Sequence, residues 1–284
     1  MTKFLKTIFE LVKFEHTIFA LPFAFMGALI GSGGSIGIKR TLYILLAMVG
    51  ARTSAMAFNR LIDASIDARN PRTRDRALPR GIISRKAVWL LILISTALFL
   101  FAVRSLNDVC FKLSPVALFL LFFYSYSKRF TSFSHFILGL VLAISPGAGF
   151  LAVNPELTLA PIILAASVLT WVAGFDIIYA CQDIEFDRAE KLFSLPASIG
   201  SQKALKISRF LHFFTIIGFF MTGALIKASF PYYLAALISS LFLVYEHSLL
   251  SGGNLQNVNV AFFNVNGYVS IIMFLGTFLN YFAL

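Results

Sequence analysis

Two short clusters of oxygen-bearing side chains lie in a chain that has only 13 acidic residues. Asn59, Asp63 and Asp67 are four residues apart, so in a helix they share one face. Asp183 and Asp187 repeat that spacing later in the chain. Like charges one helical turn apart repel each other, and two such groups therefore indicate a cation between them. Carboxylate and amide oxygens suit Mg²⁺, which also binds substrate phosphates.

The second cluster has polar neighbours at helical spacing. Tyr179 precedes Asp183 by one turn and Asp176 precedes it by two, so a continuous helix places all of them on the face of Asp187. The alternative is that both clusters are solvent-exposed helix ends that bind no metal. We favour the metal interpretation because both clusters end long apolar stretches that we expect to reach the same side of a membrane.

A basic segment directly follows the first cluster. Residues 69–86 read RNPRTRDRALPRGIISRK and contain five arginines within twelve residues, Arg69, Arg72, Arg74, Arg76 and Arg80. Guanidinium groups bind phosphate oxygens in pairs. Lys128 and Arg129 form a second, shorter group of basic residues. Acids, a metal ion and arginines together are suited to holding a diphosphate.

Arg52 lies seven residues before Asn59, deeper in the same apolar stretch and on the same face. A charged side chain there needs a partner or a water-lined cavity. The sequence leaves two partners open, the carboxylate of an aromatic acid or Asp176. Aromatic residues near the clusters, among them Tyr124 and Tyr179, could stabilise a carbocation through their ring faces.

The elements that position these residues are expected to be membrane helices. The chain is 58% hydrophobic and 13% charged over 284 residues, and a membrane span needs about 20 mostly apolar residues. Long runs of this kind predict helices, since every backbone amide in lipid must be bonded internally. We therefore predict an all-α, multi-pass membrane protein with about nine transmembrane helices around a central cavity, as a single domain over residues 1–284. The nine stretches are 17–36, 41–62, 87–105, 109–126, 134–153, 159–180, 207–227, 230–250 and 260–284, the fourth of them interrupted by Pro115.

The net charge of +11 is expected to set membrane orientation rather than to bind nucleic acid. Of the 24 Lys and Arg residues, 17 fall in or beside the N-terminus and the loops after the even-numbered stretches, against 5 in the other loops. The excess predicts a cytoplasmic N-terminus, with both acidic clusters on that side and the C-terminus outside. Residues 3–14 predict an interfacial helix, and no cleavable signal peptide is expected.

Three segments together resemble the UbiA superfamily of intramembrane prenyltransferases. The two aspartate-rich motifs of that family resemble AMAFNRLIDASIDARNPRTRDRALPRG and YACQDIEFDRAEKLFSLPASIG, and its tyrosine–lysine signature resembles YSYSKRFT. The resemblance covers almost the whole chain and is nearest to bacterial 4-hydroxybenzoate polyprenyltransferases. One departure is Asn59-Arg60, where many members carry Asn-Asp.

The resemblance implies a role for each matching residue. Asn59, Asp63 and Asp67 match the first Mg²⁺ site, and Asp183 and Asp187 match the second. Arg72 and Lys128 match residues that hold the diphosphate, and Arg52 and Tyr124 match residues of the acceptor pocket. The implied reaction moves a polyprenyl group from polyprenyl diphosphate to an aromatic acid, 4-hydroxybenzoate at its 3-position, in ubiquinone biosynthesis in the bacterial inner membrane.

Two other functions stay open at this point. The first is prenylation of a different acceptor by the same fold, a naphthoate-type acid of menaquinone biosynthesis, haem or chlorophyllide. Arg52 favours an acid over haem. The second is a secondary transporter, which is disfavoured because transporter sites lie near the bilayer midplane, at broken helices. Prenyl chain length and oligomeric state do not follow from the sequence.

Overall fold

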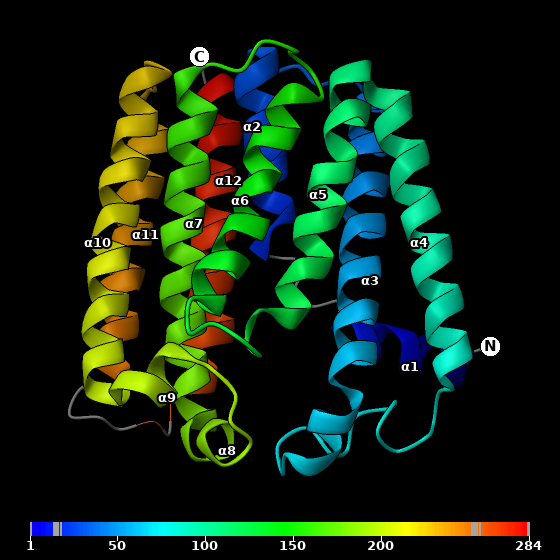
Figure 1. The fold of residues 1–284 in the computed structure, drawn as a ribbon. Coiled ribbons are helices and arrows are strands. Elements are labelled where there is room, and N and C mark those ends of the chain that lie inside the picture. The colour runs from blue at the N-terminus through cyan, green and yellow to red at the C-terminus, as the bar shows by residue number, and fades with distance from the viewer. Residues whose placement is uncertain (1, 14–16, 18, 251–254, 256, 283–284) are drawn as a thin grey trace. The chain divides into compact units, whose positions relative to one another are not determined.

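A computed structural model describes residues 2–13, 17, 19–250, 255 and 257–282. These residues form helices and no strands (Figure 1), which confirms the all-α prediction. The elements in chain order are α1 (Thr2–Val12), α2 (Leu21–Ser32), α3 (Ile38–Arg69), α4 (Arg85–Leu106), α5 (Asp108–Ser127), α6 (Ser134–Leu151), α7 (Leu159–Ala180), the 3₁₀ turn η2 (Cys181–Asp183), α8 (Ile184–Ala189), α9 (Leu195–Ile199), α10 (Ser201–Leu225), α11 (Phe230–Leu249), the π-helical turn η4 (Val260–Val265) and α12 (Asn266–Phe282).

Seven of the helical stretches in the described residues are long and apolar enough to cross a membrane. They include α3 to α7, α10, and η4 with α12. The stretch α2 has only 12 residues, and α11 has 20 but contains Glu246 and His247, which lower its mean hydropathy. The prediction of nine spans therefore stays a prediction, while the multi-pass class is confirmed.

The interruption expected at Pro115 does not occur. Helix α5 continues from Asp108 to Ser127 with Pro115 inside it. A proline removes one backbone donor and crowds the preceding turn, yet lipid-embedded helices tolerate it when neighbouring groups satisfy the freed carbonyl. The hydroxyl of Ser114 donates to the carbonyl of Phe111 at 2.7 Å in this turn.

The chain divides into two compact units, residues 1–17 with 41–126 and residues 18–40 with 127–284. A single domain over the whole chain stays a prediction. In unit 1, apolar side chains from α1, α3, α4 and the loop between α3 and α4 form one core: Leu11, Ala57, Ala64, Leu78, Ile83, Val88 and Ile92. A Cβ on Gly50 would lie 2.8 Å from the carbonyl oxygen of Ser95, so α3 and α4 pack with their backbones close together.

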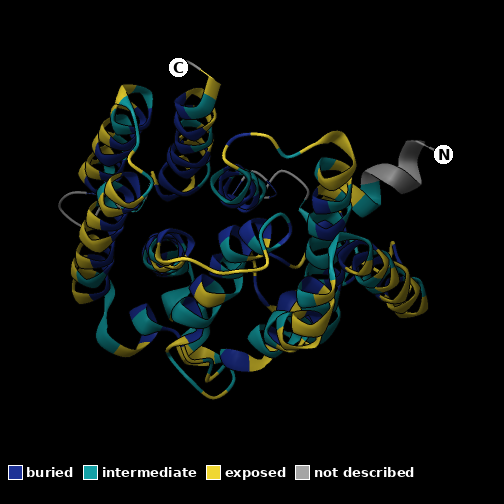
Figure 2. Cartoon of the chain, turned by 90° about the horizontal axis from the view of Figure 1, so that it is seen from above, coloured by how far each residue is buried: buried dark blue, intermediate teal, exposed yellow. Residues whose placement is uncertain are grey.

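Unit 2 is built around α7, which packs between α6 and α10. Helix α2 packs on α6, and α11 packs on α12. The core contains the rings of Phe19, Phe23, Trp171, Phe175 and Phe262. Within this unit the buried residues of the helices face their neighbours and the exposed residues face outward (Figure 2). Many of the exposed residues are large and apolar, which is expected when outer helix surfaces meet lipid rather than water.

Candidate functional site

Helix α3 presents the first acidic cluster on one face, as predicted. The helix is unbroken over its 32 residues, so Asn59, Asp63 and Asp67 stand one turn apart. The Asn59 amide nitrogen donates to Oδ2 of Asp63 at 3.3 Å. The side chains are withdrawn from solvent, because Asp63 is 3% and Asp67 5% exposed. Buried carboxylates are costly without a compensating charge or donors.

The basic segment after α3 folds back onto this cluster. Nη1 of Arg76 lies 2.8 Å from both carboxylate oxygens of Asp67, and the Thr73 hydroxyl donates to the backbone carbonyl of Asp67 at 3.0 Å. The Asn70 side chain accepts from the amide of Arg72 at 2.8 Å and forms the turn that follows the helix. Arg72 itself is exposed, so its guanidinium is accessible to a ligand.

The second acidic cluster departs from the predicted geometry. The prediction of a continuous helix from residue 176 to 187 is wrong, because α7 ends at Ala180 and a 3₁₀ turn of residues 181–183 precedes α8. Asp183 sits at that junction with φ −106° and ψ 9°. Asp187 lies in the short helix α8, where its Oδ2 accepts from the hydroxyl of Ser194 at 2.7 Å. Asp183 and Asp187 are both partly buried.

Asp176 forms a hydrogen bond with a histidine that the sequence analysis did not identify as its partner. Nδ1 of His135 on α6 lies 2.6 Å from Oδ2 of Asp176, and the amide of Leu195 donates to Nε2 of the same ring at 3.2 Å. Because Nε2 accepts, Nδ1 carries the proton and donates to the carboxylate. These bonds tie the first residue of α9 to α6 and α7, directly after Ser194, which donates to Asp187.

Two arginines of α3, Arg52 and Arg60, have backbone partners on or just after α1. Nε of Arg60 donates to the carbonyl of Leu11 at 3.2 Å, and Nη2 of Arg52 reaches that of Lys13 at 3.5 Å. These carbonyls belong to the C-terminal end of α1, where a cation is favourable. Arg60, 7% exposed, thus holds α1 in place. Nε of Arg52 is buried and has no hydrogen-bond partner among the described residues.

The remaining predicted residues are Tyr124 and Lys128. Tyr124 is partly buried near the end of α5. Lys128 follows that helix, and its carbonyl accepts from the amide of Phe193 at 2.7 Å. Unit 1 thus carries Arg52, Asn59, Asp63, Asp67, Arg72 and Tyr124, whereas unit 2 carries Lys128, Asp183 and Asp187. Each unit brings together one set of acids with at least one basic residue.

A family profile decides the relationship of this chain to known proteins. The profile described as the UbiA prenyltransferase family matches residues 20–275. This chain belongs to the UbiA prenyltransferase family. Together with its apolar helices, that membership makes it an integral membrane protein, and the family resemblance inferred from the aspartate motifs is confirmed.

Individual UbiA relatives agree over most of the chain. The 4-hydroxybenzoate octaprenyltransferase of Yersinia enterocolitica is 29% identical over 248 residues, which cover 86% of this chain and 85% of the relative. The enzyme of the same name from Francisella tularensis subsp. novicida is 28% identical over 251 residues, 87% of each chain.

Solved structures share the fold. A UbiA homologue from Aeropyrum pernix K1, in its apo form, has a TM-score of 0.85 and 32% identity, covering 92% of this chain and 96% of that one. A UbiA homologue from Archaeoglobus fulgidus bound to DMAPP and Mg²⁺ has a TM-score of 0.77 and 19% identity, covering 98% of this chain and all of that one. At that identity the second likeness speaks for the fold alone.

The donor chemistry of both clusters fits Mg²⁺. The side chains of Asn59, Asp63 and Asp67 offer hard oxygen atoms, as do those of Asp183 and Asp187, and Mg²⁺ is bound by one or two carboxylates together with waters and phosphate oxygens. In the described part of the chain no three His, Cys, Asp or Glu side chains already form a complete ligand set. Such a set is not required when substrate oxygens complete the coordination.

Proposed function

We propose that this UbiA family member transfers a polyprenyl group from polyprenyl diphosphate to an aromatic acid, with 4-hydroxybenzoate as the acceptor and its 3-position as the site of attachment. The observation that carries the proposal is the row of Asn59, Asp63 and Asp67 on one face of α3, in which both carboxylates are buried. Carboxylates withdrawn from solvent inside an apolar helix mark a functional site. The named activity of the two curated relatives supports the choice of acceptor.

In this proposal Asn59, Asp63 and Asp67 hold Mg²⁺ in unit 1, and Asp183 and Asp187 hold it in unit 2. Bound Mg²⁺ supplies positive charge that stabilises the departing diphosphate. The basic residues Arg72 and Lys128 bind the phosphate oxygens and orient the substrate. Such preorganised charge, aimed at the place where negative charge develops, is commonly the largest contribution to catalysis.

The bond changes follow from the chemistry of the substrates. The C1–O bond of the prenyl diphosphate breaks, and its electron pair leaves with the diphosphate. The ring carbon ortho to the phenol hydroxyl then donates its electrons to the allylic cation and forms the new C–C bond. Loss of the ring proton restores aromaticity. Arg52, whose Nε is buried without a partner among the described residues, binds the acceptor carboxylate, and Tyr124 lines the same pocket.

The reaction needs surroundings that exclude water, because water would quench an allylic cation. Unit 2 has a group of aromatic rings at the end of α7, next to the turn that carries Asp183. The centroids of the Tyr179 and Phe262 rings are 4.2 Å apart, and those of Phe175 and Phe262 are 5.3 Å apart. Ring faces of this kind stabilise cations. We place the protein in the bacterial cytoplasmic membrane, with the acidic clusters at the cytoplasmic surface.

Activity assays in membranes test the metal assignment. We expect Asp63→Asn and Asp187→Asn each to lower turnover of a radiolabelled prenyl diphosphate with 4-hydroxybenzoate by about a hundredfold or more, because each removes a negative charge that would hold the Mg²⁺ needed to stabilise the departing diphosphate. Chelation of divalent ions in the wild type should give a comparable loss that added Mg²⁺ restores. Asp108→Asn, which changes an exposed carboxylate on α5 paired with Arg104, is the control and should keep wild-type turnover.

Product mass spectrometry tests the acceptor separately. With a panel of aromatic acids, we expect the prenylated product of 4-hydroxybenzoate to exceed that of a naphthoate-type acid. If the naphthoate is the acid that is mainly prenylated, the proposed acceptor is wrong, but the protein is still an aromatic prenyltransferase. Normal turnover in both aspartate variants would remove the metal assignment itself.

A further inference from the structure

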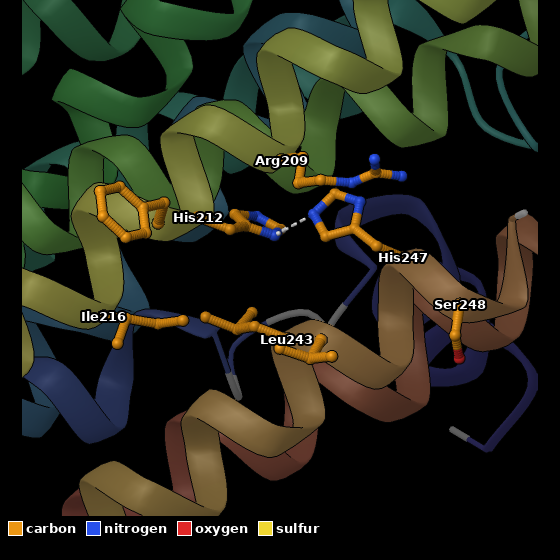
Figure 3. Close-up of a pocket in the computed structure, with 8 residues that line it drawn as sticks. Arg209, His212, Ile216, Leu243, His247 and Ser248 are labelled. Atoms are coloured by element: carbon orange, nitrogen blue, oxygen red, sulfur yellow. Dashed lines mark hydrogen bonds between the residues drawn. The ribbon is translucent and has the colours of Figure 1, made fainter.

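A pocket of about 390 Å³ lies between α10 and α11 in unit 2 (Figure 3). Pockets of about 300–1,000 Å³ are typical of sites for small molecules. The lining residues are Arg209, His212, Phe213, Ile216, Leu243, Val244, His247 and Ser248. None of these residues has a place in the proposed prenyl transfer, so the pocket is a separate feature of the molecule.

The inner wall of the pocket is a pair of hydrogen-bonded histidines. Nε2 of His247 lies 3.0 Å from Nδ1 of His212. Nε2 of His212 lies 3.2 Å from the backbone carbonyl of Trp171 and must therefore donate to it. Nδ1 of His247 has no partner among the described residues, and Figure 3 shows it on the side of Arg209. One ring nitrogen thus stays available to a ligand.

Behind the histidines lies a buried polar group made of Glu246, Asn266 and Trp171. Oε2 of Glu246 lies 3.4 Å from Nδ1 of His212 without a hydrogen bond among the described residues, and Oε1 of Glu246 accepts from the amide nitrogen of Asn266 at 2.7 Å. The Asn266 carbonyl oxygen accepts in turn from Nε1 of Trp171 at 2.6 Å. Glu246 is 0% and His212 2% exposed. The wall is therefore built in advance of any ligand, which lowers the cost of binding.

The mouth of the pocket carries positive charge. Arg209 is exposed and forms no ion pair with the described residues, and Lys203 and Lys206 stand on the same helix toward its N-terminal end, also exposed. The only acidic residue of α11 is Glu246, which faces the histidines inside. An anion at the mouth therefore meets cations that protein acids have not already neutralised.

The rest of the pocket is apolar and continuous with the outer helix surface. Phe213 and Val244 are 56% and 62% exposed, while Ile216 and Leu243 form the floor. The two helices pack mainly on other partners, α10 on α7 and α11 on α12, which leaves the seam between them open. In a membrane this surface contacts lipid chains rather than water.

We propose that the seam between α10 and α11 binds one anionic phospholipid of the surrounding bilayer. The lipid phosphate lies against Arg209, the headgroup hydroxyl reaches Nδ1 of His247, and part of one acyl chain packs on Phe213, Ile216 and Val244. Basic pockets between membrane helices are known sites for acidic headgroups. Charge complementarity at the mouth selects an anionic lipid over a zwitterionic one.

Native mass spectrometry of the delipidated full-length protein tests this site. We expect one phosphatidylglycerol to be retained about fivefold more strongly than phosphatidylcholine with the same acyl chains, the effect of one basic residue near a lipid headgroup. Arg209→Gln should remove that preference. Lys227→Gln, which removes an exposed charge beyond the opposite end of α10 and outside the pocket lining, should keep it.

A second pair of variants tests the apolar part without changing charge. Val244→Trp fills the pocket from its exposed side and should abolish retention of phosphatidylglycerol. Leu241→Trp, at a position 61% exposed on the same helix and outside the lining, should not. Thermal unfolding midpoints of all variants show whether each protein is folded.

Three results would overturn the proposal. The first is equal retention of the two lipids by the wild type. The second is unchanged preference for phosphatidylglycerol in both Arg209→Gln and folded Val244→Trp. The third is displacement of phosphatidylglycerol by millimolar inorganic phosphate, which would make the pocket a site for free phosphate rather than for a lipid.

Discussion

At Asp67 a carboxylate that is almost fully buried accepts from a single arginine nitrogen through both of its oxygens. The side chains of this pair, Arg76 and Asp67, are 26% and 7% exposed, whereas the pair of Arg104 and Asp108 on α4 and α5 is 61% and 71% exposed. Burial decides how much each pair contributes, since removal of one partner from a buried pair leaves an uncompensated charge.

Arg76→Gln is therefore expected to lower the free energy of unfolding by about 3 kcal/mol. The matched change Arg104→Gln should lower it by less than about 1 kcal/mol, because its pair is screened by solvent. Denaturant unfolding in detergent with a chelator present measures both without a contribution from bound metal. Equal losses in the two variants would mean that burial does not set the strength of these ion pairs.

Arg60 connects two helices of unit 1. It lies on α3 and donates from Nε to the carbonyl of Leu11 on α1. The neighbouring Asn59 and Asp63 keep their mutual hydrogen bond. Arg60 thus attaches α1 to α3, while the side-chain oxygens proposed as metal ligands lie next to it on the same helix.

At the scale of elements, small residues allow two helices of unit 2 to pack in backbone contact. A Cβ added to Gly149 on α6 would collide with the carbonyl oxygen of Ala24 on α2, and one added to Gly27 would collide with that of Pro146. Gly147 lies in the same helix with nothing within 4 Å of such a Cβ. Close approach of this kind is how membrane helices gain packing without a hydrophobic driving force.

Gly149→Ala is expected to destabilise the protein by about 1–3 kcal/mol, because backbone atoms must move to accept the methyl group. Gly147→Ala is expected to stabilise it by about 0.5–1 kcal/mol, since alanine restricts the unfolded chain and favours a helix. Thermal unfolding of the two variants in the same detergent compares them directly. If Gly147→Ala instead destabilises the protein, another group must lie against this turn of α6, in the space where the structure has no atom within 4 Å of the added methyl group.

The break between α7 and α8 also belongs to this scale. The 3₁₀ turn of residues 181–183 redirects the chain after α7, and the segment that follows is tied down at several points. Nε of Arg188 donates to the carbonyl of Ala197 at 2.8 Å, Ser194 donates to Asp187, and His135 accepts from Leu195. Asp183 and Asp187 thus lie on the 3₁₀ turn and on the short helix α8, and not on a continuation of α7.

For the whole molecule, the distribution of positive charge predicts how the chain sits in the bilayer. Lys and Arg residues near one set of helix ends number 17, against 5 near the other, and we expect the richer side to face the cytoplasm. With nine spans the two termini lie on opposite sides. Seven of the described stretches meet the length and hydropathy of a span, so the assignment depends on whether α2 and α11 also cross.

Reporter fusions decide this point. Alkaline phosphatase fused after Leu284 is expected to be active, because nine spans with a cytoplasmic N-terminus export the C-terminus. The same reporter inserted after Arg80 should be inactive, and green fluorescent protein at each position should give the opposite pattern. An inactive phosphatase at the C-terminus would mean an even number of spans and would reverse the placement of one or more helices.

The sequence alone determined the class of the molecule and half of the candidate site. Apolar runs of about 20 residues are typical of membrane helices, and the first motif could be recognised because Asn59, Asp63 and Asp67 lie close together in the chain. Their common face on α3 follows from the helical period, which does not depend on any distant residue.

Only the tertiary structure showed which side chains form hydrogen bonds with residues far away in the sequence. The bonded pairs His135–Asp176 and His212–His247 are separated by 41 and 35 residues. Helical spacing carries no information about which helices pack together, so these histidines look isolated in the sequence. The pocket at the α10–α11 seam has the same origin, because a cavity is a property of how two helices fail to fill the space between them.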